Sequence, residues 1–89
     1  MTYDELLRLA KNKEGSVLTT IRGKKFKVGV YMDCPFFIPQ SSGLGRSDGR
    51  LAAERFLDLY NRTGSPKTSD YQKVTRNASY FLALIHSAE

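Results

Sequence analysis

The densest group of basic side chains lies within one six-residue stretch, Arg22-Gly23-Lys24-Lys25-Phe26-Lys27. Cations at this spacing can neutralise phosphates and release the counterions that surround a nucleic acid. Lys25 and Lys27 alternate with Phe26, so a strand here would place both lysines on one face, and Tyr31 shares that face. The alternative is that lysines near an exposed hairpin keep a sheet edge from aggregating.

A second group combines cations with an amide near the end of the sequence. Its members stand at offsets of 0, 3, 4 and 7, which is one face of a helix: Lys73, Arg76, Asn77 and Tyr80. Arginine and asparagine side chains are suited to guanine and adenine edges, so Arg76 and Asn77 are candidate base contacts. The alternative is an ordinary solvated helix face.

A third group lies in the Ser/Gly-rich loop 40–49, which precedes a predicted helix. Glycines allow a backbone to approach a ligand closely, and a helix N-terminus favours an anion. Ser42, Arg46 and Arg50 would add donors for a phosphate. The loop lacks the Gly-Lys-Ser/Thr ending of a nucleotide-binding P-loop, so its alternative is a flexible connection.

Catalytic groups are few. His86 is the only histidine, and its place near a predicted helix end suits the helix dipole better than a catalytic role. Cys34 is the only cysteine and lies in an apolar stretch, which favours packing. A metal-dependent nuclease would need Asp33 to meet carboxylates distant in sequence, and no spacing supports this. We expect no enzyme, no metal and no cofactor.

The elements that must position these groups follow from local patterns. Residues 2–13 are predicted to form a helix capped by Thr2, with Glu5 completing a capping box. Three strands are predicted at 16–21, 25–31 and 34–38. The connections between them are too short for parallel crossovers, so the sequence predicts an antiparallel meander.

Two helices are predicted to follow. The first begins at Ser47 or Asp48 and ends near Gly64, with four inward positions: Ala52, Phe56, Leu59 and Tyr60. The second runs from about residue 70 to Ser87 along an apolar stripe of six residues: Tyr71, Val74, Ala78, Phe81, Leu82 and Ile85. The predicted fold class is α+β in the order α-β-β-β-α-α, with a small three-stranded antiparallel sheet packed on helices.

Composition bounds these interpretations. The 89 residues carry a formal net charge of +5 and are 40% hydrophobic, which suits a single domain over 1–89. There is no apolar run of bilayer length and no signal sequence, so we expect a cytoplasmic protein without a membrane partner. Residues 1–47 hold eight basic and four acidic side chains, against six and five in 48–89. This asymmetry favours contact through the hairpin over a recognition helix.

The leading hypothesis is a small basic nucleic-acid-binding module that contacts double-stranded DNA through the basic hairpin and the Gly-rich loop. The predicted contact residues are Arg22, Lys24, Lys25, Lys27, Ser42, Arg46, Arg50, Lys73, Arg76 and Asn77. The alternative is a protein-interaction module: an adaptor or inhibitor, such as one encoded by a mobile element, or a homodimer. Exposed tyrosine and arginine side chains would be its anchors.

Overall fold

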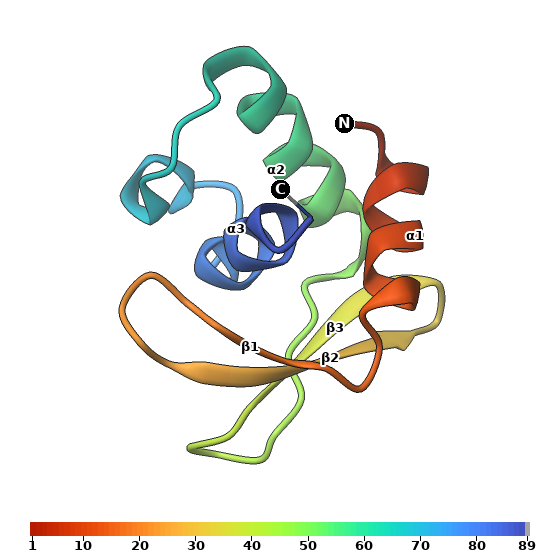
Figure 1. Cartoon of the computed structure of the whole chain (residues 1–89). Helices are drawn as coiled ribbons and strands as arrows, with labels where there is room; N and C mark the ends of the chain where they lie inside the picture. Colours follow the sequence, from red (N-terminus) through yellow and green to blue (C-terminus); the bar gives the residue numbers. More distant parts are fainter. Residues whose placement is uncertain (89) are drawn as a thin grey trace.

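The sheet is an antiparallel meander, as predicted, with the strand order β1-β2-β3 (Figure 1). The computed structural model describes residues 1–88 and contains β1 (Val17–Thr19), β2 (Lys25–Tyr31) and β3 (Cys34–Pro39). Two residues connect β2 to β3, and both have positive φ, 51° at Met32 and 59° at Asp33. Such a turn matches the twist of the strands it joins.

The first two helices form close to where the sequence predicts them. In α1 (Tyr3–Asn12) the capping box is present, because the Glu5 N–H donates to the Thr2 hydroxyl at 3.1 Å and the Glu5 carboxylate accepts from the Thr2 N–H at 3.2 Å. The second helix, α2 (Gly49–Thr63), ends at Gly64, whose φ of 62° closes it. Its buried residues are Ala53, Phe56 and Leu57.

The predicted inward face of α2 is confirmed in part. Phe56 is buried and the half-buried Leu59 and Tyr60 pack against the core, whereas the half-buried Ala52 lies outside that packing. Ala53 and Leu57 join Phe56 in the core, and the Tyr60 ring lies at its rim.

The prediction of one continuous last helix is also wrong. A short 3-10 helix, η1 (Thr68–Tyr71), is separated from α3 (Ala78–His86) by a turn. The helix stops because polar side chains in this turn bond locally: the Thr75 hydroxyl accepts from the Asn77 N–H at 3.0 Å. The six predicted stripe residues nevertheless all lie in or against the core.

The helices pack together on one side of the sheet, with α3 over its middle and α1 and α2 beside it (Figure 1). Phe26 and Phe37 from the sheet are fully buried, with ring centroids 5.7 Å apart. The Phe81 ring of α3 meets the Phe37 ring edge-on at 5.1 Å. Lys25 and Lys27 are exposed on the opposite face. Over the described part of the chain, no helix combines the length and apolarity needed to cross a membrane.

The capping box predicts a pH-dependent stability. Hydrogen bonds from the Thr2 backbone and side chain lower the pKa of the Glu5 carboxyl. The stabilisation is therefore complete above the unfolded-state pKa of about 4.3 and is lost as the pH falls through the lowered pKa of the folded state. We expect Glu5→Gln to lower the melting temperature at neutral pH and the difference to shrink in acid. Glu14→Gln, at an exposed carboxylate beyond α1, is the matched control, and a difference independent of pH would contradict the prediction.

Candidate nucleic-acid interface

Four cations from separate segments line one cleft of about 460 Å³. Arg22 and Lys24 come from the turn between β1 and β2, Arg46 from the Gly-rich loop, and Arg76 from the turn before α3. The remaining lining residues are Thr20, Thr68, Gln72, Thr75, Ala78, Ser79 and Tyr80. The fold thus brings together cations that lie up to 54 positions apart in the sequence.

The β1–β2 turn is held in shape by Thr20, whose side chain is buried. The Thr20 N–H donates to the Lys24 carbonyl at 2.8 Å, and the Lys24 N–H donates back to the Thr20 hydroxyl at 3.1 Å. Gly23 completes the turn with a φ of 84°. These bonds fix the backbone from which Arg22 and Lys24 extend.

Arg46 is positioned by an isolated bridge to β3. The Phe37 N–H donates to the Arg46 carbonyl at 3.0 Å, and the Arg46 N–H donates to the Phe37 carbonyl at 2.6 Å. Next to it, Gly45 lies on the ring of Phe36, so close that an added Cβ would stand 1.8 Å from the ring. The loop reaches this position only because residue 45 has no side chain.

Arg76 is positioned by Asp48, the residue before α2. One carboxylate oxygen of Asp48 accepts from the Asn77 amide at 2.7 Å, and the other accepts from the Thr75 hydroxyl. These two bonds hold the residues on either side of Arg76, while the Arg76 side chain is exposed. The turn before α3 is thereby attached to the start of α2.

The cleft has the electrostatics of an anion site. Among residues 1–88 no carboxylate lines it, and none of its four cations forms an ion pair. Hydroxyls of Thr68 and Ser79 and the Gln72 amide add hydrogen-bond donors. Ala78 and Ser79 are the first residues of α3, so the positive end of that helix dipole also faces the cleft.

Other predicted contact residues lie outside the cleft. Lys25 and Lys27 are exposed on the solvent face of the sheet, beyond the turn that carries Lys24. Ser42 accepts from the Leu44 N–H at 3.2 Å, which is a local loop contact. Lys73 is exposed but does not line the cleft.

The predicted shared face of Lys73, Arg76, Asn77 and Tyr80 does not form, because α3 begins only at Ala78. Asn77 is 3% exposed, and its amide is bonded to Asp48. Tyr80 is buried in the core, where its ring centroid lies 4.9 Å from that of Phe26. Of these four residues, Arg76 and Tyr80 line the cleft, and of the two only Arg76 brings a charge to it.

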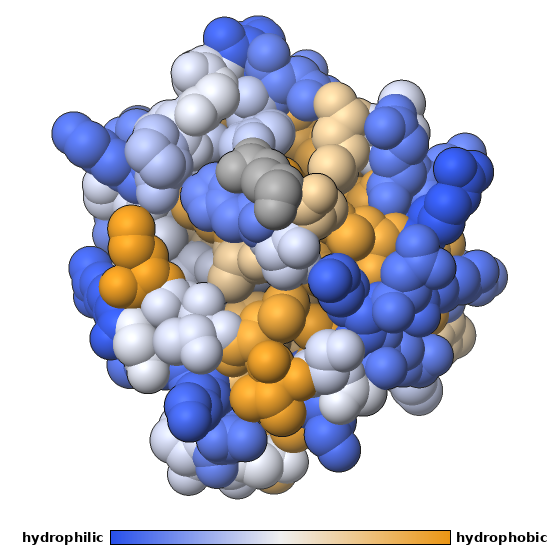
Figure 2. All heavy atoms as spheres, in the orientation of Figure 1, coloured by the Kyte–Doolittle hydropathy of each residue, from blue (hydrophilic) through white to orange (hydrophobic). Residues whose placement is uncertain are grey.

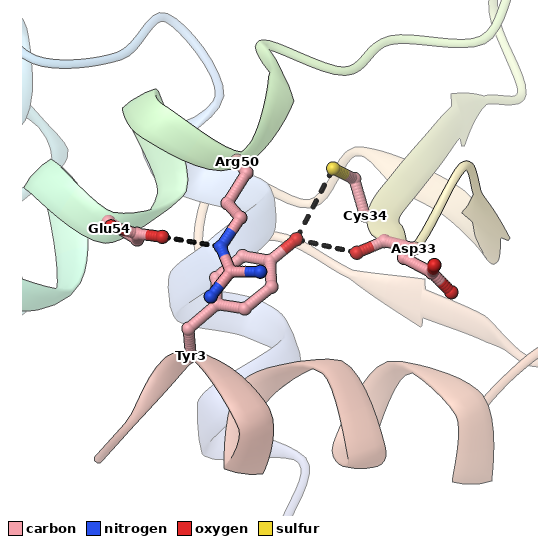
Figure 3. Close-up of polar contacts among 5 residues, drawn as sticks. All are labelled: Tyr3, Asp33, Cys34, Arg50 and Glu54. Carbon is pink, nitrogen blue, oxygen red and sulfur yellow. Dashed lines mark hydrogen bonds and ion pairs between the residues drawn. The ribbon is translucent and has the colours of Figure 1, made fainter.

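Arg50 belongs to a separate cluster that ties α1, α2 and the β2–β3 turn together (Figure 3). Its Nε donates to Glu54 at 2.5 Å, and its guanidinium carbon lies 4.5 Å from the centre of the Tyr3 ring. The Tyr3 hydroxyl donates to the Asp33 carbonyl at 2.6 Å and contacts the Cys34 sulfur at 3.2 Å. Burial, followed by the contact with Cys34, raises the pKa of Tyr3.

The contacts of this cluster join elements of the fold to one another. Cys34 packs beside the Tyr3 hydroxyl, and His86 is the last residue of α3, in agreement with the packing and helix-end positions expected for them. Within the described chain, no three His, Cys, Asp or Glu side chains gather in a way that could hold a metal ion.

Sequence reasoning missed the uncharged half of the cleft. Thr20, Thr68, Gln72, Thr75 and Ser79 line it beside the cations. Isolated polar residues of these types give no periodic or motif signal. The nearest clue was Thr75 with Asn77 before an apolar run, a pattern typical of helix starts.

Comparisons with known proteins do not assign this cleft. No family model, curated protein or solved structure matches the chain. The geometry and charge of the cleft are therefore the features that bear on function.

The fit of Gly45 against Phe36 gives a test of how Arg46 is positioned. We expect Gly45→Ala to destabilise the fold by about 1–3 kcal/mol, because the ring or the loop must move. The Arg46 amide should lose its protection from hydrogen exchange. Gly29→Ala is the matched control, since its added Cβ would meet the same ring at an ordinary 3.5 Å. Equal stability of the two variants in urea would contradict this account.

The Asp48 contacts give a second test. Asp48→Ala leaves the nearly buried Thr75 hydroxyl and Asn77 amide without their acceptor, which should cost about 2 kcal/mol of unfolding free energy. Asp58→Ala removes a carboxylate that pairs with exposed Arg62 and should cost less than about 1 kcal/mol. Urea denaturation measures both, and equal losses would refute the structural role of Asp48.

Proposed function

We propose that the chain binds double-stranded DNA and that the cationic cleft holds the phosphate backbone. The observation that carries this proposal is the convergence of Arg22, Lys24, Arg46 and Arg76 on one cleft that no carboxylate of residues 1–88 lines. Solvated cations kept only for solubility have no need to converge. Four positive charges at one place repel one another, and a phosphate relieves that repulsion.

The chemistry within the cleft is that of phosphate binding. Guanidinium groups of Arg22 and Arg76 can each give two parallel hydrogen bonds to phosphate oxygens. Lys24 contributes a point charge, and the hydroxyl of Ser79 at the start of α3 adds a neutral donor. Hydrogen bonds already fix the backbone of the β1–β2 turn, so binding has to order little of it.

The solvent face of the sheet extends the proposed interface beyond the cleft. Lys25 and Lys27 follow the turn directly and lie on the same face as Tyr31, which is 62% exposed. The rings of Tyr31 and Phe36 lie 5.8 Å apart and offer a surface for sugar or base contact. Neighbouring phosphates along the backbone would meet the two lysines.

Binding through phosphates implies modest sequence preference. The Asn77 amide is bonded to Asp48, so we leave it out of the proposed contacts, and Arg76 is the remaining candidate for a base edge. Phosphate contacts set affinity and register but carry no direct sequence information. We therefore expect different duplexes of equal length to bind with similar affinity.

The test is fluorescence anisotropy with a labelled duplex across a range of salt. Arg22→Ala combined with Arg76→Ala should weaken binding by roughly a hundredfold, at about tenfold for each charge-assisted contact. The slope of log affinity against log salt should also fall by about 1.8.

Arg8→Ala combined with Lys11→Ala is the matched control, since it removes the same charge from the exposed surface of α1. It should change affinity little. The absence of binding at low salt, or equal losses in the two double variants, would overturn the proposal. Tighter binding to single-stranded DNA or to RNA would overturn the choice of duplex.

A further inference from the structure

The outer edge of β1 is open for strand pairing. Within residues 1–88, β1 pairs with β2 alone, and the Thr20 N–H and Ser16 carbonyl bond to the β2 side of the hairpin. Because backbone groups alternate in direction along an antiparallel strand, the N–H and C=O groups of Val17 and Thr19 point away from β2. Val17 is 47% exposed, so this edge is accessible.

The other edge of the sheet, which β3 forms, is protected from strand pairing. β3 has prolines at positions 35 and 39, and Arg46 bonds to Phe37 in both directions. Natural sheets protect their edges with proline, charge, or a covering loop. β1 consists of Val17, Leu18 and Thr19 and carries neither proline nor charge.

An apolar groove of about 340 Å³ runs beside this open edge, between β1 and α3. Leu18 and Ile21 line one wall, and Leu82 and Ala83 line the other. Ile21 is 80% exposed, which is costly for an aliphatic side chain in water. In Figure 2, apolar surface crosses the middle of this face of the molecule and is bordered by hydrophilic side chains.

The groove adjoins the cationic cleft, because Thr68 and Ser79 line both. Among the described residues, neither the groove nor the cleft is lined by a carboxylate. An occupant that complements this surface has an extended backbone, an apolar side chain, and negative charge beside it. That combination is found in an acidic peptide segment.

We propose that the open edge of β1 and the groove beside α3 bind an extended peptide of a partner protein as a fourth strand. Peptide backbone groups pair with Val17 and Thr19, an apolar side chain enters the groove, and neighbouring acidic residues meet Arg22 and Arg76. Strand addition of this kind takes affinity from the backbone and specificity from the pockets. This site goes beyond DNA binding and shares only the cleft with it, so peptide and duplex compete.

The experiment selects a displayed library of random dodecapeptides on the immobilised full chain. Enriched sequences should place an aliphatic residue beside aspartate or glutamate. A labelled synthetic copy of the leading sequence is then titrated, together with a copy in which the acids are replaced by their amides. The amide copy should bind about tenfold more weakly.

Strand addition has its own readout, which is hydrogen exchange followed residue by residue. On peptide binding, the amides of Val17 and Thr19 should become protected, whereas the amide of Leu18, which faces β2, should change little. This measurement uses the unaltered protein. It separates strand pairing from contact with the groove alone.

Ala83→Met fills the groove and should weaken the peptide about tenfold without changing duplex binding. Ala52→Met, at a half-buried position of α2 outside the groove, is the matched control. Arg22→Ala combined with Arg76→Ala should weaken both ligands. Failure of duplex binding with retained peptide binding would thus remove the DNA proposal alone, and the reverse result would remove this one.

Three results would overturn the peptide site. The first is that the selection enriches no sequence. The second is that Ala83→Met and the unaltered chain bind the peptide with equal affinity. The third is that the amides of Val17 and Thr19 stay unprotected when peptide is added. Light scattering provides a further arm. A dimer that protects the same amides without peptide would show that a second copy of this chain occupies the edge.

Discussion

The carboxylate of Asp48 is the contact on which the arrangement of the functional surface depends. It binds Thr75 and Asn77, which lie 27 and 29 residues further along the chain. These bonds end the helical turn after η1 and let α3 begin at Ala78 with its own direction. They hold the residues on either side of Arg76 and attach the turn before α3 to the start of α2.

The two edges of the sheet differ, because a loop covers the β3 edge and nothing pairs with the outer edge of β1 among the described residues. Both proposals arise from that difference. At β3, a loop crosses onto the strand because Gly45 has no side chain to collide with Phe36, and Arg46 reaches the cleft as a consequence. At β1, α3 stands beside the strand but makes no backbone pairing with it. The closed edge therefore supplies a cation, and the open edge leaves unpaired peptide groups next to an apolar groove.

The sequence predicts the elements whose signals are local. Alternation over Lys25–Tyr31, the Thr2–Glu5 capping box and Gly64 each depend on neighbouring residues, and all three are confirmed. The break before α3 was not predicted, because the local bond between Thr75 and Asn77 acts together with contacts to Asp48, a residue distant in sequence. The convergence of Arg22, Lys24, Arg46 and Arg76 is likewise tertiary. The assignment of Asn77 to a base edge followed from the same missed break.

The effect of the net charge of +5 depends on where the basic side chains lie. Arg50 and Arg62 each face a carboxylate one helical turn away, so their charges are largely compensated at short range. The four cleft cations have no such partner within residues 1–88, and their repulsion persists in the folded chain. The binding of an anion is therefore more favourable at the cleft than at an average basic surface. Added salt should stabilise the folded chain through the same site.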